Sequence, residues 1–198
     1  MNPYIEALQK IDPDDIFKIA MILNSVAERG GRIFVAGNGG SSAVAQHFAS
    51  DMMKPVGYDH LDKLSVINLS DNIAFMTAVG NDSSYSGIFT RAAEAHGLSK
   101  DDAVVMFSVS GTSSNISNLV SKCHALESPT IAMCGRPLPS GKEHPVWIIG
   151  GLKFLAINPD IEYGTPLYYC VCESAFSAVA HEIARQFHIL RGNYAEAG

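Results

Sequence analysis

The spacing of apolar residues predicts a chain in which strands and helices alternate. Four short runs are almost wholly apolar, which is typical of strands buried on both faces of a sheet. The predicted strands are 32–36, 64–69, 104–108 and 130–134. Longer segments repeat apolar residues every three or four positions, as one face of a helix does. The predicted helices are 15–28, 43–53, 72–79, 85–96, 115–126 and 167–188.

This alternation predicts an α/β fold with a parallel sheet and helices on both faces. We expect residues 1–198 to form a single domain, with a helical segment over 1–30 and a C-terminal helix over about 167–188. Residues 146–158 are less regular. Their apolar stretches on either side of Gly150-Gly151 fit one strand and a second short one, or a loop, and 158–166 are typical of a loop. Ligands of such sheets bind where strands end and the following helices begin, so the loops at that edge are the candidate site.

Two small polar loops each follow a predicted strand and open a predicted helix. The first is GNGGSS, after strand 32–36, in which Gly39 and Gly40 allow the backbone to approach an anion. The second is SVSGTSS, after strand 104–108. Its candidate phosphate donors are the hydroxyl groups of Ser108, Ser110, Thr112 and Ser113. Each loop alone also fits a tight turn with a helix cap, but two such loops at one sheet edge favour anion binding.

GNGGSS is not a nucleotide-binding loop. It contains no lysine, as a P-loop requires, and its sixth residue is Ser42 where the dinucleotide-binding motif has glycine or alanine. We therefore expect no nucleotide cofactor.

Two histidines and two carboxylates lie at helical spacing. His47 and Asp51 are four residues apart and share a helix face, whereas Glu173 and His181 are eight apart on the last predicted helix. Such a set suits a divalent cation such as zinc. It also suits proton transfer near neutral pH. Residue by residue, the alternatives are a hydrogen-bonded core histidine and solvated helix positions, so the spacing alone leaves the role open.

The composition favours a compact globular protein and argues against two classes of partner. Of the 198 residues, 47% are hydrophobic and 17% are charged. No apolar run has the length of a membrane span and the first residues do not resemble an export signal, so we expect a cytoplasmic protein. The chain has 20 acidic and 14 basic residues and a net charge of −6, so we expect no nucleic-acid partner. The four cysteines are interpreted as packing residues in a reducing compartment.

Three motifs together resemble the SIS (sugar isomerase) domain family, in its phosphoheptose isomerase branch. They are GNGGSSAVAQHFASDM, TAVGNDSSY and FSVSGTSSN, and the resemblance covers residues 32 to about 135 and the last helix around Glu173–His181. It implies a three-layer α/β sandwich with a central five-stranded parallel sheet. It also implies a homotetramer with active sites at subunit interfaces, and the conversion of sedoheptulose 7-phosphate into an aldose heptose 7-phosphate.

The resemblance also implies roles for individual residues. Ser108, Ser110 and Ser113, with Asn38 and Ser41 nearby, are expected to hold the phosphate and sugar hydroxyls. Asp82, with its neighbour Asn81, matches a substrate-contacting aspartate. The expected metal ligands are His47, Asp51, Glu173 and His181, and the expected catalytic residues are Asp51, Glu173 and His181.

Two residues of the expected site depart from the family pattern, and so does the segment 146–172. Asp51 stands where the family has its catalytic glutamate, and Glu173 where it has a metal-binding glutamine. Two alternative functions remain: an isomerase of another phosphosugar, or a non-catalytic SIS protein that binds a sugar phosphate or a partner. Non-catalytic relatives lack the active-site carboxylate and histidine, so the ionisable residues retained here favour an enzyme.

Overall fold

The computed structural model of the chain describes residues 2–54, 63–135, 153–157 and 159–193. Its centre is a five-stranded sheet in the order β2-β1-β3-β4-β5, in which every pairing is parallel. The strands are β1 (Ile33–Gly37), β2 (Val66–Asn68), β3 (Ala103–Ser108), β4 (Thr130–Cys134) and β5 (Lys153–Ala156). The parallel five-stranded α/β sandwich expected from the sequence is therefore confirmed.

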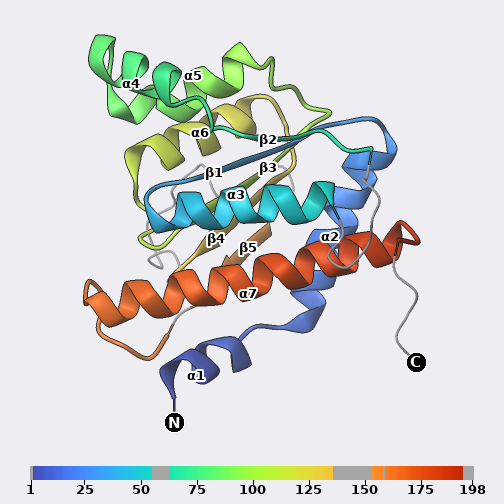
Figure 1. The fold of residues 1–198 in the computed structure, drawn as a ribbon, viewed down its shortest axis with the longest axis vertical. Helices are drawn as coiled ribbons and strands as arrows, with labels where there is room; N and C mark the ends of the chain where they lie inside the picture. The colour runs from blue at the N-terminus through green and yellow to red at the C-terminus, as the bar shows by residue number, and fades with distance from the viewer. Residues whose placement is uncertain (1, 55–62, 136–152, 158, 194–198) are drawn as a thin grey trace.

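Helices cover both faces of the sheet, which makes three layers (Figure 1). One face carries α1 (Pro3–Gln9), α2 (Pro13–Glu28), α3 (Gly40–Met53) and α7 (Pro166–Leu190). Against the other lie α5 (Ile88–Ala95) and α6 (Ser114–Ala125), with α4 (Ile73–Asp82) and the short 3-10 helix η1 (Tyr85–Gly87) beside them. Alternate strand residues fill the two cores: Val35 packs under α3 and α7, whereas Phe34 packs under α5 and α6. This two-sided burial explains why the central strands β1, β3 and β4 are mostly apolar.

Two local features differ from the prediction, and a third lies in a region that the sequence left open. The helix predicted over 85–96 is divided into η1 and α5, and Gly87, a poor helix former, stands at the division. The helix predicted over 72–79 continues to Asp82. Of the two short strands that the apolar stretches of 146–158 allow, the structure shows one, at 153–156, while 136–152 and 158 lie outside the described residues.

Three of the four cysteines are packing residues, as predicted. Cys123, Cys134 and Cys172 are buried, and burial raises the pKa of the Cys123 thiol to about 12 and that of Cys172 to about 11. Cys170 is exposed instead, because side chains two positions apart on a helix, such as those of Cys170 and Cys172, point to different sides. Among the described residues, no helix combines the length and the apolar character that crossing a bilayer requires.

A buried ion pair joins the start of β1 to the start of β3. The side chain of Asp102, 3% exposed, accepts hydrogen bonds from Arg32 Nε at 3.0 Å and Nη2 at 2.8 Å, and from the main-chain and side-chain donors of Ser99. Burial by itself raises the pKa of the Asp102 carboxyl. The hydrogen bonds from Arg32 and Ser99 outweigh it and lower this pKa to about 2.

The depressed pKa of Asp102 predicts a specific loss of stability in acid. A carboxyl group with a folded-state pKa below its unfolded value contributes stability above about pH 4, and that contribution is lost as the pH falls through about 2. The wild type should have a higher free energy of unfolding than Asp102→Asn. This difference should fall by about 2 kcal/mol as the pH is lowered from 5 to 2. Urea unfolding across this range measures the difference. A difference that does not change with pH would contradict the assigned pairing.

Candidate active site

The loop between β1 and α3 exposes the start of a helix at the carboxyl edge of the sheet. Gly39 precedes α3 with φ of 55° and ψ of −126°, a conformation that favours glycine. No side chain caps this helix. The amide groups of its first turn are therefore oriented toward the loop, where a helix N-terminus favours an anion.

The loop between β3 and α6 is stabilised by its own hydroxyl groups. Ser108 Oγ accepts a hydrogen bond from the amide of Gly111, which has a φ of 68°, and Ser110 Oγ accepts one from the amide of Thr112. Ser113 stands at the N-cap of α6, but its side chain makes no capping bond and lies 3.4 Å from Ser110 Oγ. The SVSGTSS segment thus gathers serine hydroxyls at a second helix start, as the sequence predicts.

The two loops face a common pocket of about 340 Å³. Its lining residues are Asn38, Gly39, Gly40, Ser41, Phe107, Ser108, Val109, Ser110, Ser113, Tyr169 and Glu173. Three predicted substrate residues are not among them. Thr112 is exposed outside the pocket, and Asn81 and Asp82 form the exposed end of α4, where the Asn81 amide donates to the Asp82 carboxylate at 2.7 Å.

Three residues that the sequence analysis did not single out help to build this pocket. Asn38 and Asn115 exchange two hydrogen bonds, of 2.9 and 2.8 Å, and so tie the two loops together. The Tyr85 hydroxyl donates to Asn38 Oδ1 at 3.1 Å. Tyr169 lines the pocket one helical turn before Glu173. Signals were present for all three, because Asn115 follows SVSGTSS, Tyr85 ends TAVGNDSSY, and Tyr169 shares a helix face with Glu173.

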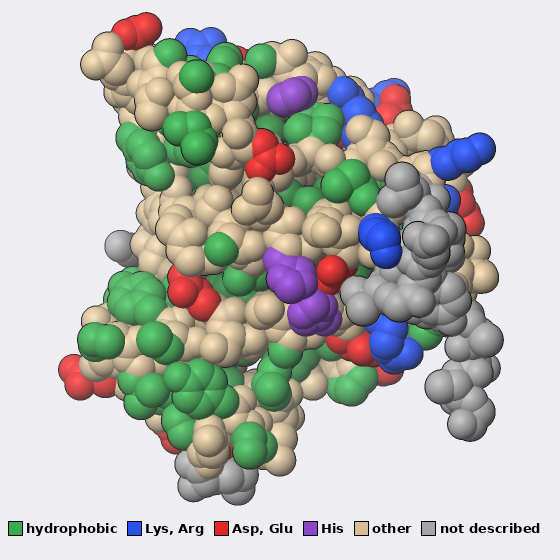
Figure 2. All heavy atoms as spheres, in the orientation of Figure 1, with side chains coloured by type: hydrophobic (Ala, Val, Ile, Leu, Met, Phe, Trp, Pro, Cys, Tyr) green, Lys and Arg blue, Asp and Glu red, His purple; other side chains and the backbone are tan. Residues whose placement is uncertain are grey.

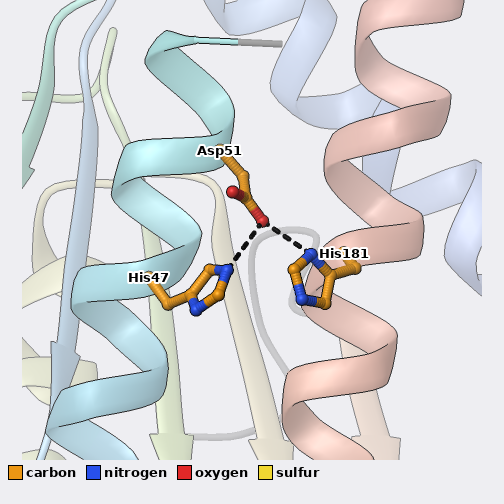
Figure 3. Close-up of side chains that lie close together, drawn as sticks. All are labelled: His47, Asp51 and His181. Carbon is orange, nitrogen blue, oxygen red and sulfur yellow. Dashed lines mark ion pairs between the residues drawn. The ribbon is translucent and has the colours of Figure 1, made fainter. Parts of the chain in front are cut away.

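A second group of side chains lies along the same pair of helices. His47 and Asp51 project from α3 and His181 from α7 (Figure 3). Asp51 Oδ2 lies 2.8 Å from His181 Nδ1 and 3.4 Å from His47 Nε2, and the two imidazole rings meet edge to face at 4.6 Å. The side chain of Asp51 is only 9% exposed, whereas both histidine side chains are about half exposed. Figure 2 shows histidine side chains at the surface where α3 and α7 adjoin.

Glu173 lies outside this group. Its carboxylate stands over Gly40 at the start of α3, where an added Cβ would overlap it, and it lines the pocket of the two loops. Eight residues along α7 correspond to about 12 Å, and α3 runs beside α7 in the same direction. The structure therefore brings three of the four predicted ligands together and leaves Glu173 with the pocket.

The contact between Gly40 and Glu173 predicts the effect of a single methyl group. In Gly40→Ala the new Cβ meets the flexible end of the Glu173 side chain, so we expect the fold to survive with little change in Tm. The displaced carboxylate would enter the pocket and repel an anion, so the affinity for inorganic phosphate should fall by about tenfold, as expected beside a like charge. Isothermal titration measures the Kd. In a Glu173→Ala background, Gly40→Ala should have almost no effect, and an equal effect in both backgrounds would contradict this explanation.

The chemistry of the three clustered residues fits a divalent cation. Two imidazoles and one carboxylate offer ligand atoms that all lie within 4.8 Å of one another. Asp51 Oδ2 is buried and has no well-aligned hydrogen bond within the described part of the chain, although two ring nitrogens lie close to it. Two nitrogens and one oxygen form a donor set that suits a zinc site with an open fourth position. The group is thus a possible metal-binding site.

Comparison with known proteins identifies similar chains. A family model described as SIS domain matches residues 1–135. Phosphoheptose isomerase from Helicobacter pylori strain 26695 is 37% identical over 127 residues, which cover 63% of this chain and 63% of that protein. The protein of the same name from strain P12 is 34% identical over 144 residues, covering 72% of this chain and 70% of that one. These alignments therefore span about two thirds of each relative.

The similarity in structure is more extensive than the similarity in sequence. A solved phosphoheptose isomerase from Francisella tularensis superimposes with a TM-score of 0.77 at 29% identity, covering 93% of this chain and 90% of that one. The superposition extends beyond the region that the sequence alignments cover.

Proposed function

The chain belongs to the SIS domain family, and from this premise we propose that it is an aldose–ketose isomerase of a phosphorylated sugar, with sedoheptulose 7-phosphate as its substrate. The observation that carries the proposal is that α3 and α7 together contribute both to the pocket of the two loops and to the contact between Asp51 and His181. Their N-terminal halves supply Gly40 and Glu173 to the pocket of the two loops. Further along, they supply Asp51 and His181, which are in contact. The names of the similar proteins support the same activity.

The pocket is the proposed phosphate end of the site. Serine hydroxyls of the β3–α6 loop and the amides at two helix starts are suitable donors for phosphate oxygens. The contact between Asp51 and His181 lies about 12 Å further along the helices, as measured by the rise between Glu173 and His181. A sugar bound with its phosphate in the pocket would extend along the helices toward this contact. Such a separation favours a long, open-chain sugar phosphate.

Asp51 and His181 are the proposed proton-transfer pair. Both histidine contacts of Asp51 involve Oδ2, so Oδ1 is the atom that would remove the proton from carbon 1 of the ketose. His181 contacts Asp51 through Nδ1, so its Nε2 would protonate the carbonyl oxygen on carbon 2. While the resulting enediol is bound, the proton on Asp51 exchanges with solvent. The enediol becomes the aldose when Asp51 delivers a proton to carbon 2 and His181 takes the proton of the oxygen on carbon 1.

The sequence offers Glu173 as a second candidate for the base that removes the proton. Its place over Gly40, away from His181, is unsuited to acting on the same two carbon atoms. We therefore assign Glu173 to the sugar hydroxyls near the phosphate end. His47, Asp51 and His181 would hold a divalent cation, zinc by their donor types, and such a cation would supply polarisation of the carbonyl group.

The proposal extends to the assembly and location of the protein. We propose a homotetramer, as the resemblance to the family implies, and a location in the cytoplasm, as the composition and the first residues lead us to expect. Several large apolar side chains on α1 and α2 are exposed in the single chain, which favours association: Tyr4, Ile5, Leu8, Phe17 and Met21. Light scattering of the purified chain measures the mass of the assembly, and a monomeric mass would contradict this part.

The test is a turnover assay on a panel of ketose phosphates. The purified chain is incubated with sedoheptulose 7-phosphate and, separately, with pentulose and hexulose phosphates, with zinc and again after chelation. Fastest turnover of the heptulose supports the proposal. Turnover of only a shorter sugar would assign an isomerase of another phosphosugar, and binding without any turnover would assign a non-catalytic sugar-phosphate-binding protein. Turnover that survives chelation would contradict the role of a metal.

A further inference from the structure

One buried histidine outside the proposed site contacts its central residue. His188 lies near the end of α7 and is 1% exposed. Its Nε2 is 2.8 Å from the main-chain carbonyl oxygen of Asp51. These two residues are 137 positions apart in the sequence. The contact therefore depends wholly on how α7 packs against α3.

The carbonyl group of Asp51 needs such a partner. It belongs to the last turn of α3, where helix carbonyls lack their usual amide donor four residues later. The amide of Lys54 donates to the carbonyl of Ser50. The next amide, which would donate to the carbonyl of Asp51, is missing because position 55 is a proline, which carries no amide hydrogen. Without His188, a helix carbonyl beside the buried Asp51 side chain would lack this donor, and a buried carbonyl without a partner is unfavourable.

Two polar contacts of the His188 ring favour the same tautomer of the imidazole. A carbonyl oxygen only accepts, so Nε2 must carry the hydrogen that bonds to Asp51. On the other side of the ring, Asn193 Nδ2 lies 3.1 Å from Nδ1 and donates to it. The neutral imidazole satisfies both contacts, so Asn193 orients the ring and the ring holds the carbonyl.

His188 and His181 lie seven residues apart, which is two helical turns and nearly the same face of α7. This face of α7 therefore contacts Asp51 twice. His181 Nδ1 contacts its carboxylate and His188 Nε2 contacts its main chain. A residue held at both ends has little freedom to slide along or rotate about the axis of α3.

We propose that His188 is a positioning residue for the reaction, fixing the last turn of α3 so that the Asp51 carboxylate stays in register with His181. The expected effect on kcat rests on the proposed function, whereas the fixed position of the Asp51 side chain does not. It also concerns the possible metal-binding group, because Asp51 belongs to that group. Loss of a residue that holds a metal ligand in place through a hydrogen bond typically lowers metal affinity or activity by about 10- to 100-fold.

Three variants separate positioning from simple stabilisation. His188→Leu removes the donor and keeps an apolar side chain of similar size, whereas His188→Gln keeps a donor. Ser128→Ala is the matched control, because Ser128 is also buried and donates its hydroxyl to a main-chain carbonyl, that of Asp102 at 2.9 Å, remote from the site. The measurements are Tm, kcat and KM with sedoheptulose 7-phosphate, and the Kd for zinc alone in the absence of sugar.

We expect His188→Leu to lower kcat and weaken zinc binding by about tenfold or more, with KM little changed because the phosphate pocket is remote. His188→Gln should stay within about threefold of the wild type, and Ser128→Ala should lower Tm without changing kcat or zinc affinity. If His188→Leu does not fold, His188→Asn, whose amide stops short of the carbonyl, must show the same losses.

A His188→Leu variant that loses only Tm, as Ser128→Ala does, would overturn the proposal, and so would a His188→Gln variant as impaired as His188→Leu. A wild-type chain without turnover would instead count against the proposed function. The zinc titration of the same variants would still decide whether His188 positions Asp51.

Discussion

Replacement of His181 by alanine is expected to lower kcat by at least about a hundredfold, the usual size of a general acid–base contribution. His181 contacts Asp51 through Nδ1 and is proposed to transfer a proton at Nε2, and alanine offers neither atom. The side chain is about half exposed, so its truncation should leave the fold intact. Steady-state kinetics and the Tm of the variant measure both effects.

A second histidine provides the control for this experiment. His124 lies on α6, on the opposite face of the sheet from α7, and His124→Ala should leave kcat unchanged. A His181→Ala variant with full activity would remove this residue from the mechanism. An equal loss in both variants would indicate a general effect of losing a histidine.

Asp51→Asn is expected to have the other large effect, a loss in kcat of about 10²- to 10⁴-fold together with weaker zinc binding. The amide keeps the size of the side chain but neither accepts a proton at Oδ1 nor presents a charged oxygen to the two imidazoles. The kinetics and a zinc titration of the purified variant measure the two losses separately.

Glu173→Gln is the matched comparison, since it makes the same chemical change in the carboxylate over Gly40. Its kcat should stay within about tenfold of the wild type, because Glu173 is proposed to contact sugar hydroxyls, which an amide also binds. The reverse pattern, with Glu173→Gln inactive and Asp51→Asn active, would transfer the role of the base to Glu173.

The three central strands of the sheet were predictable because they are buried on both faces. In Phe34 and Val35, successive side chains enter different cores, so an apolar residue is needed at every position. The two polar loops follow such strands directly, and parallel strands bring those loops to one edge. Local sequence was therefore sufficient for the parallel sheet and for the pocket built by Ser108, Ser110 and Ser113, whereas its fifth strand was expected from the resemblance to the family.

The group around Asp51 was only partly predictable. Helical spacing pairs His47 with Asp51 on α3, because residues four apart share a face. Spacing along α7 does not reveal that His181 meets Asp51 while Glu173 lies over Gly40, since both contacts depend on the direction and height at which α7 passes α3.

The role of His188 depends on two residues that local patterns do not connect. A proline after α3 removes the donor for the Asp51 carbonyl, and the replacement comes from the end of α7. Within α7 the sequence around His188 resembles any buried helix face, and only the packing of the two helices reveals its partner.

The most direct test of the central claim is the reaction of sedoheptulose 7-phosphate in deuterium oxide, followed by nuclear magnetic resonance. Proton transfer through an enediol predicts that the wild-type chain forms an aldose heptose phosphate carrying deuterium on carbon 2, and that His181→Ala and Asp51→Asn form it far more slowly. Binding of the sugar phosphate with no aldose formed, or an aldose formed without deuterium by the wild type and both variants alike, would contradict the account.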